Sequence, residues 1–391
     1  MTLPMRYAAR QVVARLRQNF LTVVCVGLVV AVFGYLLSIS DGLRKALRLT
    51  ADSALVIVLA EPATAESNSA ISHEDAQKLA AVPGVALGRA GQPCVSCEYV
   101  VQADVHRPGG SRASAIVRGV DPSVALQVRP AVKVINGRWF NPGSDELVVG
   151  RTAAVQFLEG RAGKKLLCGD RLFEVVGVID SGGGVHESEF WGYAPNIKQA
   201  YRRTMYSSAT LRLENSDADH VAAVCERIGS ACVALRGVHS PAYYESQGRG
   251  AVMIERLNMG LVLLMGLGAV FAAANMMHAT VASRTRELGV LRAIGFSPRQ
   301  VLVAVILESL LLSLIGGAVG AVLCGLWLTI LHPSKDLVSS ATFSSLAFRV
   351  SYSLKCAGWS LAIAAIIGLA GGIWPARSAG RLSITSALRS N

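Results

Sequence analysis

The sequence predicts an α-helical membrane protein with four transmembrane helices and an extracytoplasmic α+β domain. Its 391 residues are 52% hydrophobic and 16% charged, whereas charged residues make up roughly 25% of an average soluble protein. Four apolar stretches reach the ~20 residues that a helix needs to cross a bilayer. The long segment between the first two carries short strand and helix patterns instead, which indicates a folded domain outside the membrane.

The four predicted spans are almost free of charge. The first, second and fourth contain no Asp, Glu, Lys or Arg, and the third contains one acid, Glu308. An intramembrane carboxylate indicates a functional site by default, but Glu308 stands only two turns from the end of its span, so we expect a structural role. The first stretch is too long for a signal peptide and has no A-x-A-like site, which favours an uncleaved anchor. The predicted spans are 18–40, about 257–283, about 300–332 and 356–376.

Basic residues set the predicted orientation. Cytoplasmic loops are enriched in Lys and Arg, and three basic groups fall on one side if both termini are cytoplasmic. Segments 1–17, 284–299 and 377–391 are then cytoplasmic, and segments 41–255 and 333–355 lie outside. We therefore interpret the net charge of +12 as a topology signal and expect the lipid bilayer, not a nucleic acid, as partner. The groups are Arg6, Arg10, Arg15 and Arg17; Arg284, Arg286, Arg292 and Arg299; and Arg377, Arg381 and Arg389.

Two glycine pairs in the spans have the spacing of a helix-packing motif. Gly316 and Gly320 form a GxxxG in the third span, and Gly368 and Gly372 form another in the fourth. Small residues at this spacing allow two helix backbones to approach closely. Glycine is also common in membrane helices without such a role, and the sequence leaves both interpretations open.

Segment 41–255 is predicted to be a mixed domain. Ser72 is a good N-cap, with acids in the first turn of a helix that ends near Ala81. The clearest unit is a strand at 209–213, a helix capped by Ser216 that extends to Ile228, and a strand at 232–235, an order typical of α+β or βαβ structure. A final helix near 240–256 is expected to continue into the second span as a stalk. Further strands are predicted at 54–60, 98–105, 114–120, 146–150 and 172–180.

Cysteines on the extracytoplasmic side can form disulfides. Cys94 and Cys97 form a CxxC that fits a redox pair, half of a metal site or a small structural bridge, and Cys225 and Cys232 flank the end of a predicted helix. Zinc would need a second CxxC or a His pair, and no thioredoxin-like helix follows the first pair. We favour structural disulfides or free thiols.

The search for catalytic motifs yields no candidate. The chain contains no H-E-x-x-H, no G-x-S-x-G and no G-x-x-x-x-G-K-[ST], so it is expected not to hydrolyse ATP itself by the usual machinery. His186, Glu187 and Glu189 form a polar cluster that fits a metal or a partner, but we interpret it as a solvated loop. No catalytic, cofactor-binding or metal-ligating residue is predicted.

Four segments of the chain carry a resemblance to a known family. Residues 283–296 read S-R-T-R-E-L-G-V-L-R-A-I-G-F, and residues 374–389 read W-P-A-R-S-A-G-R-L-S-I-T-S-A-L-R. In this order around two spans they resemble the FtsX-like permease domain, here 256–391, of MacB-type ABC transporters, the type VII class, without a fused ATPase domain. Ile384 or Thr385 stands where that family usually has proline. Residues 136–150 and 173–179 resemble, more weakly, the MacB-like periplasmic core domain.

The resemblance implies a non-catalytic subunit in the bacterial inner membrane that transmits mechanical work. A separate cytoplasmic ABC ATPase dimer would bind ATP and Mg, and two permease copies, identical or different, would move together. MacB-like members also use a periplasmic adaptor and an outer-membrane channel for export, whereas relatives extract lipoproteins, act as sensors or regulate a cell-wall hydrolase. A membrane-anchored sensor or enzyme with no ATPase is the third reading, and the sequence names no substrate.

Segment 284–299 is the predicted ATPase-coupling segment. Its arginines and acid offer charge pairs, and its leucines and isoleucine offer an apolar face, although the arginines also fit a role in topology alone. Its glycines loosen a plain helix, so close packing or a turn is expected there. The predicted coupling residues are Arg284, Arg286, Glu287, Leu288, Gly289, Leu291, Arg292, Ile294 and Gly295.

Overall fold

The structure, a computed structural model, divides into a helical unit and a globular unit. The helical unit contains the described residues up to 40, from 254 to 331 and from 352 to 380, and the globular unit contains those from 41 to 253 and a short segment before 351. Arg6, Arg10, Arg15, Arg381 and Arg389 lie outside the described residues, as do Ile384 and Thr385. The described residues are 16–89, 91–106, 112–158, 163–331, 337–339, 346–348, 350 and 352–380.

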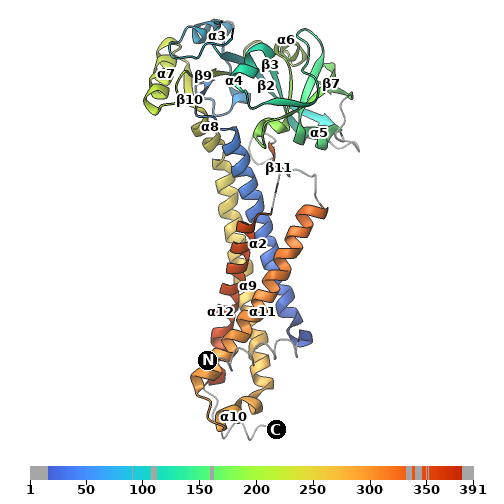
Figure 1. Ribbon diagram of the computed structural model, residues 1–391, viewed down its shortest axis with the longest axis vertical. Helices are drawn as coiled ribbons and strands as arrows, with labels where there is room; N and C mark the ends of the chain where they lie inside the picture. Colours follow the sequence, from blue (N-terminus) through green and yellow to red (C-terminus); the bar gives the residue numbers. More distant parts are fainter. Residues whose placement is uncertain are drawn as a thin grey trace. The chain divides into compact units, whose positions relative to one another are not determined.

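Four long helices are apolar enough to cross a membrane (Figure 1). Two of them extend beyond the predicted spans, because helix α2 continues to Thr50 and α9 begins at Arg249, before the apolar stretch. Both therefore carry residues of the helical and the globular unit. The helices are α2 (Leu16–Thr50), α9 (Arg249–Ser283), α11 (Pro298–Leu326, followed by a π-helical turn, Trp327–Leu331) and α12 (Leu354–Gly380).

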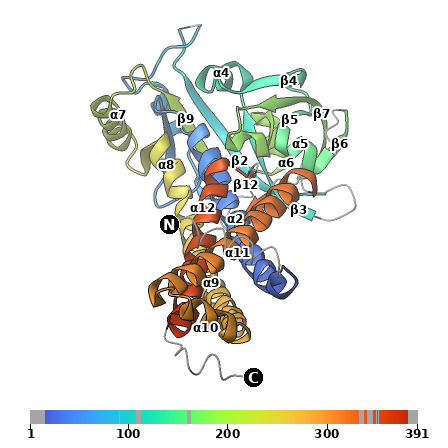
Figure 2. The ribbon, with the colours of Figure 1, turned by 60° about the horizontal axis from the view of Figure 1, so that its bottom comes forward.

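Helix α10 (Thr285–Ala293) is short and joins the ends of α9 and α11 (Figure 2). The start of α11 is fixed by local chemistry. Ser297 and Gln300 form a reciprocal capping box that satisfies two free backbone N–H groups, and Pro298 at the first helical position has its backbone φ preset. Gly295 has φ +110°, so only glycine makes the turn before α11 without strain.

The globular unit is built on one mixed sheet of ten strands in the order β10-β1-β9-β2-β3-β8-β5-β7-β4, with β6 on β7. Strand β2 connects its two halves, because residues 95–98 pair with β9 and residues 99–106 pair with β3. The strands are β1 (Leu55–Ala60), β2 (Val95–His106), β3 (Arg112–Val120), β4 (Lys133–Gly137), β5 (Glu146–Gly150), β6 (Lys165–Cys168), β7 (Arg171–Asp180), β8 (Glu189–Tyr193), β9 (Ser208–Arg212) and β10 (Leu235–His239).

Helices cover both halves of this sheet, and a separate two-stranded sheet pairs β11 (Leu337–Ser339) with β12 (Leu346–Phe348). Two 3₁₀ turns, η1 (Glu66–Asn68) and η2 (Val185–Ser188), each contain a buried acid, Glu66 and Glu187 respectively. The helices are α3 (His73–Ala80), α4 (Pro122–Val128), α5 (Arg151–Leu158), α6 (Ala194–Ala200), α7 (Ala218–Ala231) and α8 (Ser240–Gln247).

The predicted strand–helix–strand unit is present with shifted boundaries. Helix α7 has Asp217, not Ser216, at its N-cap, and the second strand begins at Leu235, where it was expected to end. Strands β9 and β10 both pair antiparallel with β1, so they run parallel to each other with β1 between them. The unit is therefore a split β–α–β arrangement, and α7 packs on the sheet through Val221, Val224 and Ile228.

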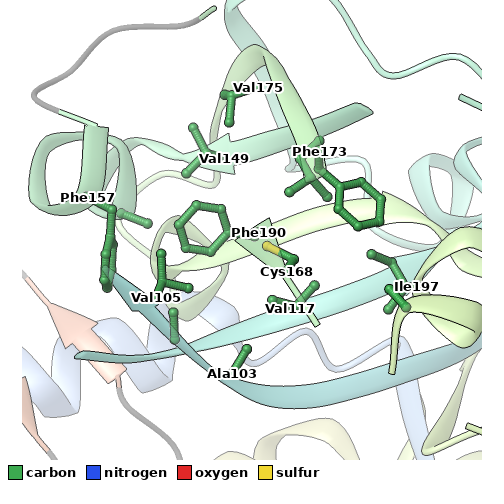
Figure 3. Packing of buried hydrophobic residues seen from close by; sticks show 14 of the residues in the cluster. Ala103, Val105, Val117, Val149, Phe157, Cys168, Phe173, Val175, Phe190 and Ile197 are labelled. Atoms are coloured by element: carbon green, nitrogen blue, oxygen red, sulfur yellow. The ribbon is translucent and has the colours of Figure 1, made fainter. Parts of the chain in front are cut away.

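Strand alternation builds the second half of the globular unit. Phe190 and Trp191 are neighbours on β8 and point to opposite faces, as strand geometry requires. Phe190 packs with Phe157, their ring centroids 5.5 Å apart, in the larger core (Figure 3). Trp191 packs with Val148 and Ile179 on the other face. Both rings are fully buried.

Candidate functional site

The predicted coupling segment folds as α10 and the turn after it, with one side against the helical unit. Leu288 and Gly289 are buried and Leu291 is half-buried. Leu288 belongs to a cluster with Met277 of α9 and Val305 of α11. These side chains therefore hold α10 against the helices that it connects, and are not available to a partner.

The other side of α10 is exposed. Arg286, Val290 and Ile294 follow the i, i+4 spacing of one helix face, and Glu287 is exposed beside them. Ile294 is 73% exposed and Val290 is 42% exposed. The predicted apolar face is thus divided, because Leu288 and Leu291 point inward and Ile294 points outward. Val290, which was not among the predicted coupling residues, is exposed on the same side as Ile294.

A buried ion pair lies beside α10. Arg284 and Glu308 are each 4% exposed, and the Nη1 of Arg284 donates to the two carboxylate oxygens of Glu308 at 3.1 and 3.0 Å. Glu308 therefore has the expected structural role: it holds Arg284, a residue of the predicted coupling segment, in an ion pair. Arg292 is half-buried, and Gly295 makes the turn described above.

The predicted packing glycines stand at helix crossings inside this chain. A Cβ on Gly320 would lie 2.2 Å from the carbonyl oxygen of Gly27 on α2, and one on Gly316 would lie 2.8 Å from that of Val23. The second pair faces α11, where a Cβ on Gly368 would lie 2.8 Å from Ser313. A Cβ on Gly372 would lie 2.8 Å from Ser309, whose hydroxyl donates to the Gly368 carbonyl at 2.8 Å.

The globular unit contains a buried ionic network centred on Arg118 of β3. Its guanidinium donates to the two carboxylate oxygens of Glu66 at 3.0 Å each, and to those of Glu189 at 2.8 and 2.9 Å. It also bonds Glu98, which Arg129 contacts as well. All five side chains are under 10% exposed. The network links side chains from η1, β2, β3 and β8 with Arg129, the C-cap residue of α4. It therefore connects the two halves of the sheet through buried ion pairs.

The guanidinium charges determine how these carboxyls ionise. Burial alone would raise the pKa of Glu98, but the charges of Arg129 and Arg118 outweigh burial and hold the pKa below its usual value. The same competition, with Arg118 and His186 as the charges, holds the pKa of Glu189 well below its usual value. These acids are therefore ionised in the fold, and their stabilisation depends on the two arginines.

The polar cluster at 186–189 was interpreted as a solvated loop, and this interpretation is wrong. His186, Glu187 and Glu189 are under 10% exposed. Glu189 accepts hydrogen bonds from Arg118 and from the indole N–H of Trp191, at 2.7 Å, and contacts His186 Nδ1 at 3.1 Å. A local pattern cannot show this burial, because the decisive partner is 71 residues away in the chain.

Glu187 differs from its neighbours. Burial, together with a hydrogen bond to Asp180, raises its pKa above the usual value. Its side chain accepts from the backbone N–H of Gly183 at 2.5 Å. Among the described residues no group of three or more His, Cys, Asp and Glu side chains is arranged to hold a metal ion.

A cavity of about 340 Å³ lies next to the network, within the globular unit. Arg129, His186 and Tyr244 line it, together with two buried hydroxyls, those of Ser181 and Ser240, that have no hydrogen-bond partner among the described residues. Its polar lining is neutralised by the carboxylates of the network, so the cavity indicates no particular ligand charge.

All the cysteines in the two candidate disulfide pairs are free thiols in the structure. Cys94 packs with Leu55 in a small cluster, whereas Cys97 packs against the core on the other side of the sheet. Their odd spacing along an extended chain directs them apart. Cys225 and Cys232 are seven residues apart along α7, roughly 10 Å at 1.5 Å per residue, beyond the Cα separation that a disulfide bridges.

Two family models match the chain. The MacB-like periplasmic core domain matches residues 19–230, and the FtsX-like permease C-terminal domain matches residues 259–384. The chain belongs to the MacB/FtsX-like permease family. The first match covers the globular unit up to α7, and the second covers α10, α11 and α12. The predicted fold class, an α-helical membrane protein with an α+β periplasmic domain, is confirmed.

Curated relatives of this MacB-like permease are export proteins by name. It is 28% identical to the pyoverdine export ATP-binding/permease protein PvdT of Pseudomonas entomophila (strain L48) over 66% of the chain and 40% of that protein. It is 34% identical to the macrolide export ATP-binding/permease protein MacB of Bordetella avium (strain 197N), over 34% of the chain and 20% of that protein. The chain thus spans less than half the length of these relatives.

Solved structures include two similar domains. The periplasmic region of MacB from Actinobacillus actinomycetemcomitans covers 51% of the permease chain and 94% of its own, with 15% identity and a TM-score of 0.38. The extracellular domain of the noncanonic ABC-type transporter YknZ from Gram-positive bacteria covers 47% of the permease chain and 99% of its own, with 17% identity and a TM-score of 0.36.

Proposed function

We propose that this permease is the non-catalytic transmembrane subunit of an ABC transporter that couples ATP hydrolysis by a separate cytoplasmic ATPase to movement of its periplasmic domain, for export or extraction of a substrate. The single observation that carries the proposal is the division of α10. One side is anchored inside the helical unit by Leu288, and the other presents Arg286, Val290 and Ile294 outward.

This geometry allows α10 to transmit a partner's movement to the helices that it connects. An apolar side chain that is 73% exposed on a helix between two spans gains free energy when a partner covers it. The buried side passes any displacement of α10 to α9 and α11, since close-packed interiors transmit strain. Helices α2 and α9 each carry residues of both units, so they supply a continuous path from α10 toward the periplasmic domain.

The proposal includes an assembly. Two ATPase copies would bind ATP and Mg, and each would contact α10 of one of two permease copies, identical or different. Both termini would be cytoplasmic in a bacterial inner membrane, as the basic residues around the spans favour. The names of the relatives favour export, for which a periplasmic adaptor and an outer-membrane channel would complete the route.

A charge on the exposed face of α10 tests the proposal. The tagged full chain is purified from its native membranes in mild detergent, and ATP hydrolysis of the preparation is measured. Ile294→Asp is expected to lower the co-purified ATPase activity roughly tenfold or more, because an interface residue that is central and desolvated contributes about 2 kcal/mol or more. Val290→Asp should act in the same direction.

Val233 provides the matched control. It is 92% exposed in the globular unit, so Val233→Asp makes the same chemical change away from α10 and should leave the ATPase activity unchanged. Equal activity for Ile294→Asp and Val233→Asp, at equal recovery of the permease, would contradict the coupling role of α10.

A further inference from the structure

Helices α2 and α9 both join the chain to the same half of the large sheet. Helix α2 leads into β1, and α9 follows β10 and α8. Strand β1 pairs with β9 and β10, and these three strands form the first half. The inserted half, β3 to β8, lies in the chain between β2 and β9. A movement of α2 therefore reaches the first half through the backbone, but reaches the inserted half only through its connections to β2 and β9 and through non-covalent contacts.

The last residue of α2 makes such a contact. The backbone N–H of Val185, the first residue of η2, donates to Thr50 Oγ1 at 2.7 Å, and the Thr50 hydroxyl donates to the carbonyl oxygen of Ala46 at 2.9 Å. Both Thr50 and Val185 belong to the globular unit. One hydroxyl thus joins the end of α2 to η2. Strand β8, which follows η2, is two strand spacings from β2, roughly 10 Å, so this attachment is separate from the connection through β2.

The glycines before η2 fit this contact. Gly182 and Gly183 have φ of +70° and +91°, a region that glycine enters far more readily than other residues. A Cβ on Gly183 would lie 3.3 Å from Leu49 Cδ1, and one on Gly184 would lie 2.8 Å from Thr50 Oγ1. The loop approaches the end of α2 this closely because it carries no side chains.

The turn η2 is held to the inserted half by buried polar contacts. Glu187 accepts from the backbone N–H of Gly183 at 2.5 Å, and Glu189, at the start of β8, contacts His186 Nδ1 at 3.1 Å. Glu189 also accepts from Arg118 of β3 at 2.8 and 2.9 Å. A displacement of η2 therefore passes to β8 and β3, since close-packed interiors transmit strain.

We propose that Thr50 is the positioning residue through which α2 moves the inserted half of the sheet. Its hydroxyl makes the inserted half follow α2, whereas the first half follows α2 through the backbone that leads into β1. This inference rests on the proposed function, because it needs an ATPase that moves the helices, and it adds the point at which that movement enters the inserted half.

Distances between spin labels, measured by double electron–electron resonance in the complex with its ATPase, test the proposal. Leu354→Cys on α12 and Leu172→Cys on β7 form the first label pair, which follows the inserted half. Leu354→Cys and Val233→Cys form the second pair, which follows the first half. All three positions are exposed. The native thiols are buried or half-buried, and labelling of the unmodified chain gives their background. With Thr50 in place, ATP and vanadate, which trap the ATPase, should shift both distances.

Thr50→Val removes the hydroxyl and keeps the β-branched shape. It should reduce the shift of the first pair about twofold or more, because the Val185 N–H then has no acceptor that joins it to α2. The shift of the second pair and the ATPase activity should stay unchanged. Thr50→Ser keeps the hydroxyl but loses the methyl group, so a full shift in this variant assigns the effect to the hydrogen bond and not to packing.

Thr329→Val is the matched control. The Thr329 hydroxyl also donates to a carbonyl oxygen four residues earlier, that of Gly325 at 2.7 Å, but it lies in the π-helical turn after α11. Both distance shifts should be retained in this variant.

A second variant disrupts the same contact from the other side, in case Thr50→Val does not accumulate. Gly184 has φ −79°, which alanine adopts without strain, so the main effect of Gly184→Ala is a Cβ against Thr50 Oγ1. It should reduce the shift of the first pair as Thr50→Val does.

The proposal is overturned if Thr50→Val and Gly184→Ala keep the full shift of the first pair, if Thr50→Ser loses as much of it as Thr50→Val, or if Thr329→Val loses it too. When both pairs shift equally with and without the Thr50 hydroxyl, the proposed function stands and only the role of Thr50 is refuted. If neither pair shifts with Thr50 in place, although a bound ATPase hydrolyses ATP, the proposed function fails and this proposal fails with it.

Discussion

The buried ionic network makes a quantitative prediction for Arg118→Met. The substitution keeps an apolar stem of similar length and removes the guanidinium that donates to Glu66, Glu98 and Glu189. Removing one partner of a buried ion pair costs about 3–5 kcal/mol. Here three carboxylates lose a partner and only Arg129 remains as a guanidinium, so we expect the upper end, about 5 kcal/mol. That is a large part of the ~5–15 kcal/mol stability of a folded domain.

The assay is urea unfolding of the full chain in detergent, followed by tryptophan fluorescence. Trp191 donates to Glu189 inside the network. Once Trp327, Trp359 and Trp374 of the helical unit are replaced by Phe, the emission comes from Trp191 and from Trp139, whose ring centroid lies 6.3 Å from that of Trp191, so it reports on this region. If Arg118→Met does not accumulate, Glu189→Gln provides a milder step that removes one charge and keeps the shape.

Arg138→Met is the matched control. Arg138 pairs with Glu146 at 2.6 Å but is 52% exposed, and an exposed ion pair contributes only about 0–1 kcal/mol. The reasoning is refuted if Arg118→Met lowers the free energy of unfolding by no more than Arg138→Met does.

Three further outcomes are expected. Gly320→Leu should lower the thermal aggregation midpoint in detergent, because its Cβ would meet the α2 backbone at 2.2 Å, whereas Gly260→Leu, with open space around it, should be neutral. Glu187→Gln should stabilise the globular unit at neutral pH but not near pH 4, since the raised pKa of Glu187 gives stability that is lost as pH rises through it. Acidification should destabilise the wild type below the ordinary glutamate pKa, because the lowered pKa values of Glu98 and Glu189 contribute stability that is lost as pH falls toward them. Urea unfolding at several pH values measures both pH effects.

Local sequence patterns were sufficient to predict the elements that short-range interactions determine. The predicted strand at 54–60 is β1, and the serine predicted to cap a helix, Ser72, accepts from the backbone N–H of Asp75 at 3.0 Å. Four apolar stretches correspond to four long helices because length and charge alone decide whether a helix can cross a membrane.

Features that depend on contacts between residues far apart in the sequence were missed. Strand β8 begins at Glu189. A glutamate at the start of a strand suggests an exposed position from the local sequence, and only the pairing with the distant Arg118 explains its burial. Nothing near Ile294 in the sequence separates it from Leu288, although their exposures are opposite. Which side of α10 faces inward depends on how α9 and α11 pack, and packing over this range is not encoded in a short pattern.

The most direct test of the central claim is the composition of the complex that the permease forms. The tagged full chain is purified from native membranes in mild detergent, and the co-purified proteins are identified and counted by mass spectrometry. Our account predicts a P-loop ATPase in equal numbers with the permease, two of each per complex. A complex with no P-loop ATPase, in a crosslinked sample as well as an untreated one, would contradict it.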